Sequence, residues 1–415
     1  MNSTSSNRSR PLARIVLLAA FAAAIGASAP AVAQEALRPE VGKPLQAAQE
    51  MVKGGRFKEA LAKVREAEAA GARNANETFL IERMRLAAAS GAGDADTAAR
   101  SFEAISGSSR IASADKLRMI ESIAGSYYRQ QQYAKAMQWG QRYFREGGTS
   151  GAIRTMLIQS QYLSGDFAGA AKELMAEVQG AERAGNAPAE DRLKLLLNAA
   201  MKQKDNNAYV FAMEKLVTYY PKKEYWVDLL SRMQRKPGFS DRLSLDTYRL
   251  SLATGSMTAP ADYMEMAQLA LQADLPTEGK YVVDKGFAGG VLGTGAQADR
   301  HKRLRDLVEK RLAESKAGMA EAEKQAMAAK TGEALVSLGM DHLYGGQAAK
   351  GVQLIQQGIG KGGLKRPEDA KLHLGIGQLV AGDKAKAQAT FKTVQGADGT
   401  ADLARLWALY TRRNA

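Results

Sequence analysis

The residues with the clearest potential for chemistry lie in a glycine-rich stretch, 286–295, which reads GFAGGVLGTG. Gly293, Gly295 and Ala298 fit a loose dinucleotide-binding loop, whose glycines let a backbone approach a pyrophosphate at the start of a helix. Such a loop requires a preceding β-strand, whereas residues 281–285 have the pattern of a helix. The lysine and hydroxyl of a phosphate-binding loop are also absent after Gly295. We therefore interpret this stretch as a linker.

Other reactive side chains are few. The chain has no cysteine, and its three histidines, His301, His342 and His373, are scattered. Without thiolates, three such histidines are too few to predict a metal cage. No serine or threonine stands in a nucleophile elbow, and no acidic pair stands out from the surface charge. The sequence predicts no catalytic residue, no metal and no cofactor, so the expected function is binding.

The elements that would carry a binding surface are indicated by a phrase that recurs along the chain. A turn residue is followed by an aromatic residue two places later and by alanine five places later, as in Gly55, Phe57 and Ala60. With weaker copies included, the turn residues are Gly55, Gly93, Gln131, Gly165, Lys204, Gly238, Asp274, Gly346 and Gly382. They lie 34 to 39 residues apart, except for one interval of 72, which is two periods of 36. This period predicts an all-α solenoid of stacked antiparallel helix hairpins.

Residue size follows the same register. Small residues stand seven places before and five places after the turns, and large apolar residues stand nine places after them. The small ones are Ala48, Ala124, Ala267, Gly339 and Gly375 before the turns, and Ala60, Ala98, Ala136, Ala170, Gly279, Gly351 and Ala387 after them. The large ones are Val64, Phe102, Leu174, Met213, Val283, Ile355 and Phe391. Small residues at helix crossings and large ones between them are what hairpin packing requires.

In its better copies the repeat resembles the tetratricopeptide repeat (TPR) family. Residues 339–346, GMDHLYGG, and residues 375–391 are similar to that family's pattern of small, aromatic, glycine, alanine and phenylalanine residues. The resemblance covers about nine units between residues 45 and 395. It implies a TPR-like superhelix that binds a protein or peptide segment in a concave groove.

The resemblance also implies which residues line the groove, namely first-helix positions two, three, six, ten and thirteen places before a turn. At the turns of residues 131, 165, 204 and 238 these positions include basic, amide and tyrosine side chains, which we call the basic track: Arg118, Tyr128, Arg129, Tyr162, Lys194, Asn198, Lys202, Arg232, Arg235 and Lys236. Arginine pairs with carboxylates bidentately, and tyrosine offers a large contact area with a polar tip. We expect an acidic partner here; the alternative is an ordinary solvated surface of a basic protein.

The repeat is interrupted once, between the turns at residues 274 and 346. We predict a signal peptide over 1–33, an N-terminal array over 34–285, a glycine-rich joint with a charged helical segment over 286–330, and C-terminal repeats over 331–415. The missing unit would be a longer helix pair within 296–330, kinked at Gly318. Residues 401–413 are expected to form a capping helix that shields the end of the stack.

The N-terminus predicts export. Arg8, Arg10 and Arg14 precede the apolar run 15–26, and residues 31–33, Ala-Val-Ala, form a small-x-small cleavage signal. This is a Sec-type signal peptide, with cleavage expected after Ala33, because the run is shorter than the ~20 residues of a membrane-spanning helix. No transmembrane segment is expected after its removal. The alanine-rich signal and the cysteine-free chain favour the bacterial periplasm, with secretion as the alternative.

Three function classes follow from these features. We predict an exported, non-enzymatic scaffold or adaptor that binds a protein segment in envelope assembly or export. The alternative is a periplasmic protein that binds a polyanion, an acidic glycan or anionic lipid, through its net charge, which falls from +14 to +11 when the three arginines of the signal are removed. Nucleic acid is not expected, given export and 44 acidic residues, and an enzyme lacks a catalytic cluster. The oligomeric state is left open.

Overall fold

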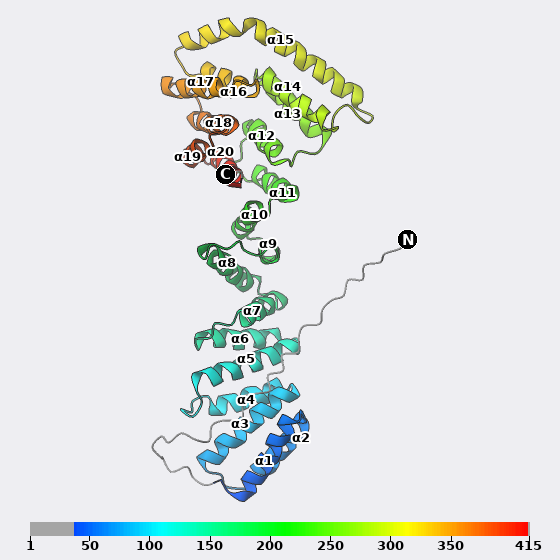
Figure 1. Cartoon of the computed structure of the whole chain (residues 1–415), viewed down its shortest axis with the longest axis vertical. Helices are drawn as coiled ribbons and strands as arrows, with labels where there is room; N and C mark the ends of the chain where they lie inside the picture. Colours follow the sequence, from blue (N-terminus) through cyan, green and yellow to red (C-terminus); the bar gives the residue numbers. More distant parts are fainter. Residues whose placement is uncertain (1–36, 414–415) are drawn as a thin grey trace. The chain divides into compact units, whose positions relative to one another are not determined.

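The structure is a computed structural model that describes residues 37–413. The predicted signal peptide lies outside these residues. The described part of the chain is helical, with twenty α-helices, one short 3-10 helix and no strand (Figure 1). The prediction of an all-α fold is therefore confirmed. The chain divides into two compact units, which we call unit 1 (to Ala170) and unit 2 (from Ala171).

Unit 1 is built from consecutive helices that pack in pairs. The pairs α1–α2, α3–α4 and α5–α6 each pack together, and each contacts the helix that follows. The helices are α1 (Pro39–Lys53), α2 (Phe57–Glu68), α3 (Ala75–Ala92), α4 (Ala95–Ile105), α5 (Ser113–Arg129), α6 (Tyr133–Arg145), α7 (Gly151–Leu163) and the start of α8 (Phe167–Arg183).

Unit 2 contains the rest of α8 and the remaining helices. The pairs α9–α10, α13–α14, α16–α17 and α18–α19 pack as hairpins. The helices are α9 (Glu190–Gln203), α10 (Asn206–Tyr219), α11 (Lys223–Gln234), η1 (Asp241–Leu243), α12 (Ser244–Thr254), α13 (Pro260–Gln272), α14 (Pro276–Ala288), α15 (Ala298–Ala328), α16 (Glu333–Tyr344), α17 (Ala348–Lys361), α18 (Pro367–Val380), α19 (Lys384–Thr393) and α20 (Thr400–Arg413).

The nine predicted turn residues share one backbone conformation. All have positive φ, including the non-glycine residues Gln131 (59°), Lys204 (60°) and Asp274 (55°). At most of them the next amide bonds back to a carbonyl near the end of the preceding helix, as from Gln132 to Tyr127 at 3.0 Å. This is the Schellman ending, in which a left-handed residue stops one helix and turns the chain into the next. The repeat period therefore marks real hairpin turns.

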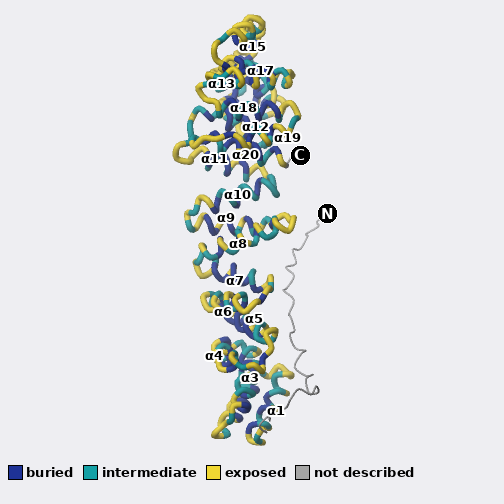
Figure 2. The backbone as a smooth tube through the Cα atoms, turned by 90° about the vertical axis from the view of Figure 1, so that its left-hand side faces the viewer, coloured by how far each residue is buried: buried dark blue, intermediate teal, exposed yellow. Residues whose placement is uncertain are grey.

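The predicted crossings are close contacts in the structure. The alanines at these positions are fully buried, among them Ala60, Ala136 and Ala387. A Cβ built on Gly339 would stand 2.7 Å from the carbonyl oxygen of Gly351, and one built on Gly351 would stand 2.6 Å from that of Gly339. Only glycine permits α16 and α17 to approach in this way. Buried and exposed residues follow one another along each helix, because one side of the helix packs inward and the other faces solvent (Figure 2).

The expectation of a helix pair within 296–330 is wrong, because Ala298–Ala328 form one continuous 31-residue helix, α15. By the period, its turn would fall near Lys310, where Glu309, Lys310 and Arg311 are good helix formers without a glycine or proline. The helix also continues through Gly318. Residues on both sides of this segment, such as Val282 and Met340, share one core. Its role as a joint stays a prediction.

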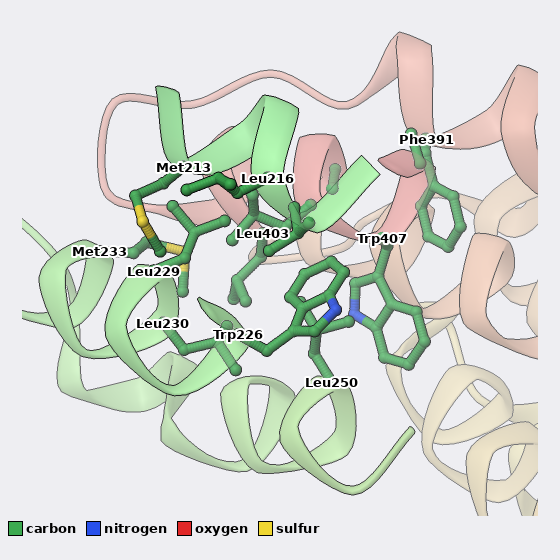
Figure 3. Close-up of a cluster of buried hydrophobic side chains, with 14 of the residues drawn as sticks. Met213, Leu216, Trp226, Leu229, Leu230, Met233, Leu250, Phe391, Leu403 and Trp407 are labelled. Atoms are coloured by element: carbon green, nitrogen blue, oxygen red, sulfur yellow. The ribbon is translucent and has the colours of Figure 1, made fainter. Parts of the chain in front are cut away.

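The last helix joins distant parts of unit 2. Besides following α19, α20 packs against α10, α12 and α18. Trp407 of α20 lies in one buried cluster with Trp226 of α11 and Phe391 of α19 (Figure 3). In addition to covering α19, α20 thus connects helices of unit 2 that are far apart in sequence.

Candidate functional site

The basic track divides between the two units, and we describe each part by itself. In unit 1, Arg118 and Arg129 are exposed on α5. The hydroxyl of Tyr128 donates a 2.8 Å hydrogen bond to Gln159 of α7. Tyr162 makes an edge-on contact with Phe167 at a ring distance of 5.2 Å. Unit 1 therefore presents arginine and tyrosine side chains along the first helices α5 and α7.

In unit 2 the track runs along α9 and α11. Lys194, Asn198, Lys202, Arg235 and Lys236 are all exposed. Two of these cations are already paired within the chain. Lys194 lies 3.0 Å from Glu190, and Lys236 lies 2.7 Å from Asp402 of α20.

Glu190 organises the start of α9. It accepts hydrogen bonds from Lys222 at 2.6 Å and from the hydroxyl of Tyr225 at 2.5 Å. The hydrogen bond from Lys222, followed by those from Tyr225 and Lys194, lowers the pKa of Glu190 to about 2. Burial and the same carboxylate raise the pKa of Tyr225 to about 12. At neutral pH the basic charge at this end of α9 is thus partly neutralised.

Arg232 of the basic track lines a pocket. This pocket, of about 310 Å³, lies at the turn between α9 and α10 and is lined by Ala200, Met201, Lys204, Asp205, Asn206, Tyr209 and Arg232. The guanidinium of Arg232 stacks over the ring of Tyr209 at 3.4 Å, and its Nε has no hydrogen-bond partner among the described residues. Its nearest carboxylate, Asp228, is 3.7 Å from Nε. The hydroxyl of Tyr209 donates to that same carboxylate.

Exposed apolar side chains flank these charges. Met201 is 50% exposed on α9, and Val227 is 49% exposed on α11. In unit 1, Leu163 is exposed next to Tyr162. Apolar anchors beside arginine and tyrosine are typical of surfaces that bind protein segments.

A buried charge network in unit 2 was not predicted from the sequence. Arg249 of α12 donates to Glu278 of α14 at 2.7 and 2.6 Å and to Asp246 at 2.6 Å. His373 of α18 places Nε2 3.0 Å from Asp246. Although burial opposes it, the charges of His373 and Arg249 lower the pKa of Asp246. One signal was present, since Arg249 follows the buried Leu245 by four residues and so shares its helix face.

Further observations bear on metal ions and membranes. The three histidines lie on three different helices, α15, α16 and α18. In the described part of the chain, no three histidine, aspartate or glutamate side chains are placed to share a metal ion. No helix between residues 37 and 413 combines the length and the apolar character needed to cross a bilayer.

Comparisons with known proteins give only low similarities. No family model and no curated protein matches the chain. The crystal structure of yeast Tom70 is 11% identical, with 90% of this chain and 96% of that chain covered and a TM-score of 0.24. The TPR domain of P58(IPK) is 12% identical, with 90% and 97% covered and a TM-score of 0.22. These low values carry no argument about fold or function. The turns and crossings described above show that each unit contains helix hairpins.

Proposed function

We propose that this chain is an exported scaffold that binds an acidic protein segment on the first-helix faces of its hairpins. Tandem hairpins expose one face of each first helix at regular intervals, which suits an extended partner. On α5, α7, α9 and α11 these faces carry most of the basic track.

The pocket at Arg232 is the single observation that carries this proposal. Its guanidinium is oriented by Tyr209, and the carboxylate of Asp228 lies 3.7 Å from its Nε, longer than a charge-assisted hydrogen bond. A carboxylate from a partner would meet an arginine that is held in place. The neighbouring Met201 would contact an apolar side chain of the same segment.

The alternative is a polyanion-binding protein whose affinity depends on net charge. Polyanion binding at α9 and α11 is less favoured because two of their cations are already paired, Lys194 with Glu190 and Lys236 with Asp402. The two functions differ in salt dependence, because a charge-driven binder loses affinity steeply as salt rises.

Charge reversal tests the proposal. A library of acidic peptides with one apolar residue is screened against the purified chain, and the dissociation constant of the best peptide is measured by fluorescence anisotropy. Arg129→Glu and Arg232→Glu together should weaken it more than tenfold, about 1.4 kcal/mol or more. The single variants assign the loss to unit 1 or unit 2.

The matched control reverses two exposed cations of α15, Lys302 and Arg311. This pair changes the net charge equally but lies outside the basic track. An equal loss from both pairs would mean that only net charge matters, and the polyanion alternative would replace the scaffold.

Export forms a separate part of the proposal. The arginines, apolar run and Ala31-Val32-Ala33 signal support a periplasmic chain that begins at Gln34. Mass spectrometry of the protein from its native envelope tests this. Retention of residues 1–33 would argue for an N-terminal anchor in its place.

A further inference from the structure

A second, larger cavity lies under α15 in unit 2, and it shares no residue with the basic track. Its volume is about 800 Å³, and its walls come from α14, α15 and α16 with the turn that follows α16. The buried residues of α15 explain it. They end at Leu312 and resume only at Ala326, so the middle of the helix spans the space without packing into it. The cavity has the size of a small-molecule site.

The lining carries more positive than negative side chains, since Lys280, Lys285 and Lys316 face two carboxylates, Asp284 and Asp341. Asp284 is held by Lys280 at 2.8 Å, and Asp341 accepts from the amide and hydroxyl of Thr277 at 2.9 and 2.7 Å. Asp284 is therefore paired with a cation, whereas Asp341 is held by neutral donors. The ammonium groups of Lys285 and Lys316 also line the cavity and form no ion pair with any residue from 37 to 413. An anion fits this charge distribution better than a cation.

The remaining walls are aromatic and apolar. Tyr281 and Tyr344 lie with their rings 5.1 Å apart at 39°. Leu312 and Met319 of α15 also line the space, and the ammonium of Lys285 stands 5.3 Å from the ring of Tyr281. A flat apolar group is the body that such walls accommodate.

One buried polar atom in the lining lacks a partner. His342 is only 8% exposed, and its Nε2 has no hydrogen-bond partner within the described chain. An unsatisfied buried nitrogen destabilises the fold, and a ligand that bonds to it would offset that cost. In the Nε2–H tautomer this nitrogen donates to an oxygen of the ligand.

We propose that this cavity binds a carboxylate carried on an aromatic group. Lys285 and Lys316 meet the carboxylate, and Tyr281 and Tyr344 contact the ring. The same chemistry is found in a free aromatic acid and in the C-terminal end of a peptide that finishes with an aromatic residue, so both sources are tested. This site goes beyond the proposed scaffold function and does not depend on it.

The experiment uses isothermal titration of the purified chain with three probes: phenylacetate, N-acetyl-Gly-Gly-Phe with a free carboxylate, and neutral phenylacetamide. At least one of the two acids should bind with a dissociation constant of about 1 mM or tighter. Phenylacetamide should bind about tenfold more weakly than phenylacetate if the free acid is the source. If only the peptide binds, the ligand is the C-terminal end of a peptide chain.

Two variants of α15 locate the site. Lys316→Glu should weaken binding of that acid by about tenfold or more. Lys310→Glu, at another exposed lysine of the same helix outside the lining, should change it by no more than about twofold. Tyr281→Leu should also weaken binding. Because this change removes an aromatic ring and leaves the lysines in place, its effect measures the ring contact separately from the charge. No binding by either acid, or equal losses from Lys316→Glu and Lys310→Glu, would overturn the proposal.

Discussion

The guanidinium of Arg249 on α12 and the carboxylate of Glu278 on α14 are joined by two hydrogen bonds of 2.7 and 2.6 Å, and both side chains are buried. Burial alone would lower the pKa of Arg249, but the carboxylates of Glu278 and Asp246 raise it, so the arginine stays charged. Two helices that are not a hairpin pair are thereby fixed to each other inside unit 2.

Arg249→Met should destabilise the protein strongly. The change leaves Glu278 and Asp246 buried with less compensation, and breaking a buried ion pair from one side costs about 3–5 kcal/mol. Adding Glu278→Met removes one orphaned carboxylate and should recover part of that loss. Urea unfolding followed by circular dichroism measures both. A double variant less stable than Arg249→Met would show that packing, and not charge, accounts for the loss.

Gly351→Ala should destabilise the hairpin of α16 and α17. The added Cβ would stand 2.6 Å from the carbonyl oxygen of Gly339, so the two backbones must separate, at a cost of roughly 1–3 kcal/mol. Gly360→Ala on the same helix is the control, because nothing lies within 4 Å of its Cβ. That change should stabilise the helix by about 0.5–1 kcal/mol. Thermal melts that rank the two variants in the opposite order would contradict the assigned crossing.

Gln131→Gly should stabilise unit 1. Gln131 has φ 59°, where a side chain costs roughly 1–2 kcal/mol, and glycine removes that cost while losing more chain entropy. The expected net gain is about 0.5–1 kcal/mol. Gln132→Gly, one residue later at φ −83°, has no such strain to relieve and should destabilise. If the two glycine variants change the free energy of unfolding equally, the positive φ of Gln131 does not destabilise unit 1.

The repeat register was predictable because each hairpin needs the same local solution. A left-handed turn and small residues near it recur in sequence, so Gly55, Gln131 and Lys204 were found without a structure. The helix α15 was not predictable from the period, since its sequence keeps helix-forming residues where a turn was expected. Contacts between distant segments have no such local signature. Arg249 with Glu278, and the lining of the cavity under α15, depend on how separate helices pack.

The contact between Arg38 and Glu77 should make unit 1 sensitive to acid. Hydrogen bonds from the Arg38 guanidinium, with others from the backbone of Asn74 and Arg38, lower the pKa of Glu77 from 4.5 to about 2. A lowered pKa stabilises the fold above pH 4.5, and that contribution is lost as the pH falls toward 2. The difference in melting temperature between the wild type and Glu77→Gln should therefore shrink over this interval.

Glu59→Gln serves as the control for acid, because Glu59 is exposed on α2. Its difference from the wild type should stay constant with pH. A constant difference for Glu77→Gln as well would mean that the ion pair with Arg38 does not stabilise unit 1.

Trp407→Ala should loosen helices far from α20 in sequence. The indole of Trp407 stacks on Phe391 of α19 at 6.1 Å and 15°, and it belongs to the cluster that holds Trp226 of α11. Removing a buried tryptophan costs about 3–5 kcal/mol. Hydrogen exchange followed by mass spectrometry should show faster exchange in α10, α11 and α12 as well as in α19, because local opening follows lost packing. If faster exchange were confined to α19 and α20, α20 would be a simple cap on the last hairpin. Its contacts with the earlier helices of unit 2 would then not stabilise those helices.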